Sequence, residues 1–213
     1  MAIFNKISLS VLALSVFACA SSFAELPRFY VGTKLGGSYA MSKVEGTAIE
    51  TTAVTRTEAN IDRTDSDTVF SVNPLIGLEF NYNKDLNARF EIEGFFHSKA
   101  KDKGYDFKSN GAFVNYFVDL KVHPVFVPYA GFGLGVAHNN FAGKVKNQFA
   151  WHAGAGVSFI TTDNLTFDIG ARYAQYGKYS DHVYEEDDGS NYDLDFESKL
   201  SSIDFLAGVR YAF

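Results

Sequence analysis

Apolar and polar side chains alternate with a period of two along much of the sequence after residue 28. Such alternation marks β-strands whose two faces meet different surroundings. The pattern predicts about eight strands and an all-β, antiparallel, up-and-down arrangement. The predicted strands are Phe29–Met41, Val69–Tyr82, Ala88–Phe96, Ala112–Leu120, Tyr129–Ala137, Phe149–Phe159, Phe167–Tyr173 and Ile203–Phe213.

The connections between these strands alternate in length. An even number of antiparallel strands, with tight turns at one end and long loops at the other, is typical of barrels that span the bacterial outer membrane. We therefore predict an eight-stranded transmembrane β-barrel over residues 25–213, with a flexible first loop. Short connections fall near 83–86, 121–126 and 161–164, and long ones near 43–67, 98–110, 138–148 and 177–199.

One face of the predicted strands carries both the charged residues and most of the glycines. Small residues fit the narrow interior of an eight-stranded barrel, whereas the opposite, bulky apolar face fits lipid. An unpaired buried charge would cost several kcal/mol, so we interpret the charges as a structural ion-pair network in the lumen; a proton or ion path is the alternative. The predicted network consists of Lys34, Glu79, Arg89, Glu91, Glu93, Asp119, Asp168, Arg172, Asp204 and Arg210.

The N-terminus has the features of a secretory signal peptide. Lys6 precedes a largely apolar run over 7–20, and small residues at Ser22 and Ala24 favour cleavage after Ala24. We therefore predict that residues 1–24 are removed. Cys19, the one cysteine, lies in this segment; acylation there is an alternative that the bulky Phe17 disfavours. Cleavage changes the formal net charge from −6 to −7, and an acidic chain is a poor partner for nucleic acid.

The C-terminal strand ends on an aromatic residue, and its outward positions are apolar. Together with the segments 128–135, 153–157 and 168–173, this strand resembles the small bacterial outer-membrane barrels of the opacity-type porin and surface antigen family. The resemblance covers essentially the whole mature chain. It implies that the barrel assembly machinery recognises the C-terminal strand, and that the protein is exposed at the cell surface. The implied assembly signal consists of Phe205, Val209, Tyr211 and Phe213.

No residue is assigned a catalytic, cofactor-binding or metal-binding role. The five histidines have no recognised metal spacing, and the acidic stretch over 178–199 lacks an EF-hand pattern, although a cation site there is an alternative. His97 and Ser98 suggest an enzyme that modifies lipid. Adjacent strand residues point to opposite faces, however, so the two are poorly placed for nucleophilic catalysis.

We therefore expect a non-catalytic outer-membrane protein with an adhesion or host-interaction role and no cofactor. The expected partners are outer-membrane lipid and lipopolysaccharide, the barrel assembly machinery, and host surface molecules that contact the loops at 43–67, 98–110, 138–148 and 177–199. No nucleic-acid partner is expected. A lipid-modifying enzyme of the outer leaflet and a narrow ion channel are the alternative functions.

Overall fold

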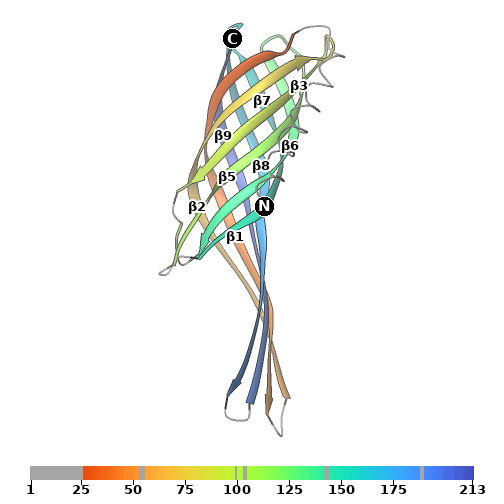
Figure 1. Cartoon of the computed structure of the whole chain (residues 1–213). Coiled ribbons are helices and arrows are strands. Elements are labelled where there is room, and N and C mark those ends of the chain that lie inside the picture. The colour runs from red at the N-terminus through yellow and green to blue at the C-terminus, as the bar shows by residue number, and fades with distance from the viewer. Residues whose placement is uncertain (1–25, 53–55, 99, 103–104, 142–143, 188–189) are drawn as a thin grey trace, which may run out of the picture.

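The strands form a closed barrel in the computed structural model, which describes residues 26–52, 56–98, 100–102, 105–141, 144–187 and 190–213. The order β3-β2-β1-β9-β8-β7-β6-β5 is closed by pairing of β3 with β5, while β4 pairs with β5 beyond the end of β3. The wall therefore has eight antiparallel strands, as predicted (Figure 1). The strands are β1 (Arg28–Thr52), β2 (Arg56–Asn81), β3 (Leu86–His97), β4 (Ala100–Asp102), β5 (Tyr105–Leu120), β6 (Phe126–Phe141), β7 (Lys144–Ile160), β8 (Leu165–Asp187) and β9 (Ser190–Ala212).

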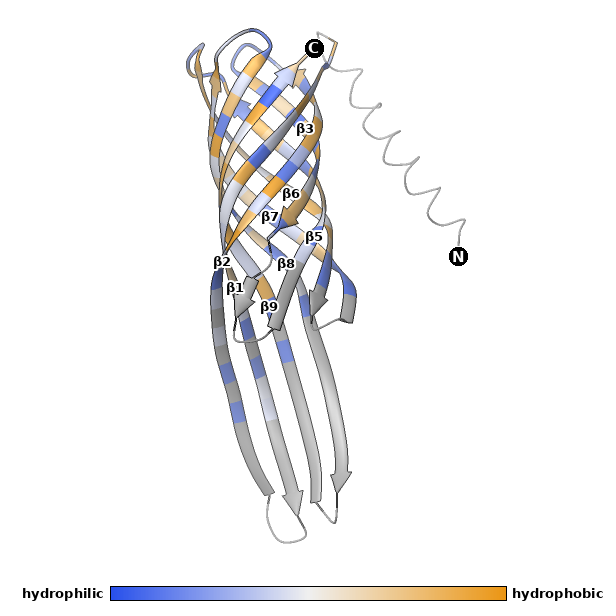
Figure 2. Cartoon of the chain, turned by 90° about the vertical axis from the view of Figure 1, so that its left-hand side faces the viewer, coloured by the Kyte–Doolittle hydropathy of each residue, from blue (hydrophilic) through white to orange (hydrophobic). Residues whose placement is uncertain are grey.

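The wall has an apolar outer face and a polar inner face, as the alternation predicts. On β9, Phe205 is 64 % exposed, whereas its neighbour Asp204 is fully buried. Figure 2 shows the same alternation of hydrophobic and hydrophilic residues along the barrel strands. Closure pairs the backbone groups within the wall, so the apolar exterior can face hydrocarbon without unsatisfied hydrogen bonds. No helix among the described residues is long and apolar enough to cross a bilayer.

Three tight turns join the strands at the end of the barrel that carries the C-terminus, as predicted. In the first, Asn83 Oδ1 accepts hydrogen bonds from the backbone N–H groups of Asp85 (2.9 Å) and Leu86 (2.8 Å). In the third, Thr162 Oγ1 accepts one from the Leu165 N–H at 3.0 Å. Such side-chain bonds to the following backbone are the reason that Asn and Thr favour turns.

The prediction of long loops at the other end is wrong for the described residues. β1 and β2 remain paired as far as Thr51 and Arg56, and β8 and β9 as far as Asp187 and Ser190. Most of 43–67 and 177–199 is therefore strand, and the strands at 98–110 and 138–148 are also longer than predicted. The alternation of apolar and polar residues ends in these segments because they pass beyond the closed wall. There, neither face of a strand is packed against lipid or against the lumen.

β1, β2, β8 and β9 continue past the wall together as a four-stranded sheet (Figure 1). We call this the outer sheet and define it as residues 43–52, 56–67, 178–187 and 190–199. A bulge between Gln175 and Lys178 marks its base on β8, where Gly177 has φ of 119°. The predicted signal peptide, residues 1–24, lies outside the described residues.

Candidate functional site

A continuous chain of ion pairs crosses the lumen. It begins with Arg89, whose Nε lies 2.7 Å from Asp119 Oδ2 and whose Nη1 lies 3.1 Å from Glu91 Oε1. Lys34 Nζ then lies between Glu91 (2.7 Å) and Glu93 (2.8 Å). Acid and base thus alternate along this chain of contacts, and each of these buried charges has a partner of opposite sign.

Arg172 completes this chain on the far side of the lumen. Its Nη1 lies 2.6 Å from Glu93 Oε1, and its Nε lies 2.7 Å from Asp204 Oδ2. A separate pair joins Arg210 Nε to Asp168 Oδ2 at 2.6 Å. Nine of the ten residues predicted to share the lumen are therefore buried and ion-paired there.

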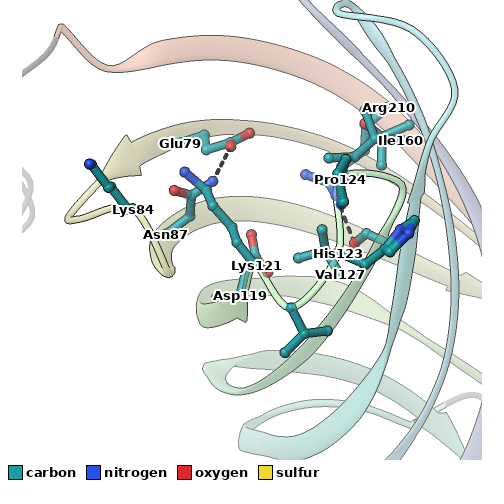
Figure 3. Close-up of a pocket in the computed structure, with 13 residues that line it drawn as sticks. Glu79, Lys84, Asn87, Asp119, Lys121, His123, Pro124, Val127, Ile160 and Arg210 are labelled. Carbon is teal, nitrogen blue, oxygen red and sulfur yellow. Dashed lines mark hydrogen bonds between the residues drawn. The ribbon is translucent and has the colours of Figure 1, made fainter.

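The tenth, Glu79, is half-buried at the mouth of the lumen. It accepts a hydrogen bond of 2.7 Å from Asn87 Nδ2. Both residues line a pocket of about 340 Å³ at the tight-turn end, and Figure 3 shows them beside Lys121 and Asp119. Lys121 Nζ in turn donates to Asn81 Oδ1 at 2.9 Å. Because Asp119 and Arg210, two members of the lumen ion pairs, also line it, this pocket is an extension of the lumen.

Uncharged residues outside the predicted network fill the rest of the lumen. Tyr30 donates a hydrogen bond to Glu91 Oε1 at 2.9 Å, and Asn115 Nδ2 donates to Glu93 Oε2 at 3.0 Å. Above the ion pairs, the rings of Phe95 and Phe113 stack with centroids 4.8 Å apart. The signal for these residues was present in the sequence, because they share the alternation phase of the buried charges.

His97 and Ser98 face opposite sides of the wall. His97 is buried in the lumen, whereas Ser98 is exposed, and its Oγ accepts a hydrogen bond from the Phe70 N–H. A cavity of about 20 Å³ lies beside His97 and Ser38, large enough for one water molecule. Within the described residues, no group of three His, Cys, Asp or Glu side chains could hold a metal ion.

Comparison with known proteins gives the family. Residues 9–213 match the family model described as an outer membrane protein beta-barrel domain. The chain belongs to this family of bacterial outer-membrane β-barrels. Outer membrane protein PagN of Salmonella typhimurium is 29 % identical over 177 residues, which cover 68 % of this chain and 73 % of PagN.

Two further proteins resemble this outer-membrane barrel. The 25 kDa outer-membrane immunogenic protein of Brucella melitensis is 31 % identical over 103 residues, which cover 45 % of this chain and 43 % of that protein. The crystal structure of Neisserial surface protein A has a TM-score of 0.52 at 20 % identity, covering 87 % of this chain and 97 % of that structure. The structural match supports the barrel fold.

Membership of this family also orients the barrel. Outer-membrane barrels have short turns in the periplasm and longer connections outside the cell. The tight turns and the C-terminus therefore lie on the periplasmic side, and the outer sheet projects from the cell surface. At about 3.3 Å per residue, its ten residues of β1 extend about 30 Å beyond the wall.

The outer sheet holds most of the acidic excess of this outer-membrane barrel. Its four segments contain thirteen Asp and Glu residues but five Lys and Arg residues, an excess of eight negative charges. The rest of the chain has fourteen basic and twelve acidic residues. The acidic character of the outer sheet follows from its sequence and strand register, because most of its side chains lie outside those that the structure describes.

The outer sheet also has two edges without a neighbouring strand. The β2–β3 ladder begins at Ser71, and the β7–β8 ladder ends at Gln175. Beyond these points, no ladder among the described strands covers the outer side of 56–67 or of 179–187. Such edges offer backbone donors and acceptors to an incoming extended chain.

Proposed function

We propose that this protein is a non-catalytic surface protein that binds molecules of host or neighbouring cells through its outer sheet. The observation that carries the proposal is the sheet itself: four strands continue past the wall and carry the acidic excess of the chain. Membrane anchorage does not require these residues, because the closed wall already pairs its own backbone. Their length and charge therefore point to recognition outside the cell.

The lumen supports the alternative functions less well. An ion channel requires an open path, whereas paired charges and stacked rings fill the described interior. A lipid-modifying enzyme built on His97 and Ser98 requires the two side chains on one side of the wall. We therefore favour binding over conduction or catalysis.

Deletion of the outer sheet tests this proposal. Residues 46–61 and 181–196 would each be replaced by Asn-Gly, which closes a two-residue hairpin between the paired positions Glu45/Asp62 and Ser180/Glu197. We expect the deleted protein to reach the outer membrane and to shift on gels after boiling, while cells that carry it lose adhesion to host-cell monolayers.

The control is the same double deletion with the outer sheet replaced by Gly/Ser-rich loops of equal length. Loss of adhesion in both proteins, at equal surface amounts, would support the proposal. Full adhesion by the Asn-Gly protein would show that the outer sheet is not the binding surface.

We also propose that the C-terminal strand carries the assembly signal. Phe205, Tyr211 and Phe213 are all exposed on the outer face. The Phe213 N–H donates to the Phe29 carbonyl at 2.9 Å, so the C-terminus is bonded to the start of β1. Replacement of Phe213 by Ala should reduce the amount inserted in the outer membrane, while refolding in detergent is retained; unchanged insertion would contradict this role.

A further inference from the structure

Three lysines lie in one row at the base of the outer sheet. Lys43 on β1 is directly opposite Lys199 on β9, and Lys199 is directly opposite Lys178 on β8. Their side chains remain between 44 and 53 % exposed. Like charges directly opposite one another on neighbouring strands are destabilising, so this arrangement requires an explanation.

The row lies immediately above the apolar belt of the wall. On β1, Lys43 shares the outward phase of Leu35 and Tyr39, which are both exposed. On β9, Lys199 shares the outward phase of Ile203. The lysines therefore continue the outward face of the wall, four residues beyond Tyr39 on β1 and Ile203 on β9.

Acidic residues occupy the next row, farther from the membrane. Glu45 is directly opposite Glu197 on β9 and Asp62 on β2. Glu197 lies 2.5 Å from Lys178 and 3.0 Å from Lys199, and these bonds hold the pKa of Glu197 below its usual value. Every ion pair of these lysines among the described residues joins them to Glu45 or Glu197 in the row above, either along one strand or diagonally, and none is directed toward the membrane side.

The position of these lysines is unusual for this sheet. Three of its five cationic residues share the single row beside the membrane, although the outer sheet as a whole is strongly acidic. On the outward face, the lysines lie nearer the wall than the acidic row of Glu45, Asp62 and Glu197; Asp65 and Asp67, which lie at or below the level of the lysines, belong to the inward phase. The separation matches a membrane surface, where anionic headgroups attract lysines.

We propose that Lys43, Lys178 and Lys199 bind a phosphate group on a lipid headgroup of the outer leaflet. A phosphate on the membrane side of the row would relieve the repulsion between adjacent ammonium groups and would fix the depth of the barrel in the bilayer. The glutamates hold the lysine side chains from above, and Lys is an effective ligand for phosphate as a point charge.

The single tryptophan of the chain provides a native probe for this site. Trp151 on β7 is opposite Gln175, which is opposite Ser201, so it lies in the row directly beneath the lysines. The full mature protein would be placed in phosphatidylcholine bilayers that contain phosphatidic acid brominated near the top of its acyl chain. Quenching of Trp151 fluorescence by this lipid is compared with quenching by phosphatidylcholine brominated at the same position. The difference measures how strongly the site prefers the phosphate headgroup.

We expect native protein to prefer phosphatidic acid, and the double variant Lys178→Gln/Lys199→Gln to lose about fivefold of that preference for each lysine. The matched control is Lys84→Gln/Lys121→Gln at the periplasmic end, which should retain the native value. Glu45→Gln/Glu197→Gln should increase the preference, because it removes the competing carboxylates. A row that serves only as an ion-pair cluster would not show this increase.

A comparison of two buffers of equal ionic strength, one of sodium phosphate and one of sodium chloride, distinguishes a lipid headgroup from free phosphate as the ligand. Equal quenching of Trp151 in the two buffers is expected for a headgroup site. A loss of quenching in the phosphate buffer alone would show that the site takes the free anion. The proposal is overturned if native protein shows no preference, or if the Lys178→Gln/Lys199→Gln variant keeps it. Folding of each variant is checked by its gel shift on heating.

Discussion

The wall and the outer sheet share the strands β1, β2, β8 and β9, but their charged side chains have opposite environments. Inside the wall, Lys34 lies between two glutamates and is almost fully buried, so its position is fixed by the ion pairs around it. In the outer sheet, Lys43 is half-exposed and lies opposite another lysine. The first arrangement minimises the cost of buried charge, whereas the second leaves charge available to a partner.

The difference follows from what surrounds each region. A charge in a filled lumen has no water to solvate it, so removal of one partner leaves the other uncompensated. A charge on the outer sheet is solvated and screened, and its ion pairs contribute little to folding. Substitutions that are chemically alike should therefore have very different effects on stability in the two regions.

The largest effect is expected for Glu93→Ala. Glu93 is fully buried and accepts from Lys34, Arg172 and Asn115, so its loss leaves two buried cations short of a partner. We expect the free energy of unfolding to fall by about 3–5 kcal/mol, measured by urea titration in detergent micelles with heat-dependent gel migration as the readout.

Glu45→Ala is the matched control in the outer sheet, since Glu45 also pairs with lysines but its side chain is 44 % exposed. Its urea midpoint should equal that of the native protein. A large shift for Glu45→Ala, or a negligible one for Glu93→Ala, would remove the proposed distinction between the two regions.

A second comparison uses two glycines of the wall. A side chain at Gly133 would collide with Asn115 and His152 inside the lumen, whereas one at Gly37 would meet no atom within 4 Å on the outer face. We expect Gly133→Val to cost about 1–3 kcal/mol in the same urea assay, because a packed interior resists added volume. Gly37→Val should be tolerated, and equal losses would indicate that the lumen is not tightly filled.

Gly177 connects the two regions. Its φ of 119° favours glycine, and an added Cβ would meet the side chain of Gln148. We expect Gly177→Ala to cost about 1 kcal/mol and to speed amide hydrogen exchange over 179–187 more than in the wall. Uniform exchange across β8 would show that the bulge does not separate the wall from the outer sheet.

The wall could be predicted from sequence because its two faces meet different surroundings. Asp204 is buried and its neighbour Phe205 is exposed, and this contrast repeats along the described part of each strand of the eight-stranded wall. The charged residues of the lumen were found by the same signal. Their partners were not, since the pairing of Arg172 with Glu93 joins residues on different strands across the lumen.

The outer sheet could not be predicted in this way. Its strands lie beyond the wall, so the period-two contrast disappears, and the sequence of the first long connection, near 43–67, predicts a flexible loop instead. The lysine row was also not predictable from the sequence, because the bulge changes the register of β8 against β9. Continued pairing from Gln175 and Ser201 would place residue 177 opposite Lys199, whereas the bulge brings Lys178 there.

The smallest effect is expected at the junction of the two regions. Tyr39 lies on the outer face at the top of the wall, and its hydroxyl donates to Ser66 Oγ on β2 at 2.8 Å. Tyr39→Phe removes one exposed hydrogen bond, so the free energy of unfolding should fall by about 0.5 kcal/mol or less. A urea titration beside Ser66→Ala, which breaks the same bond from the other strand, would check that value. A loss above about 1.5 kcal/mol in both variants would mean that the outer sheet contributes to the stability of the wall, because a single solvated bond cannot supply that much.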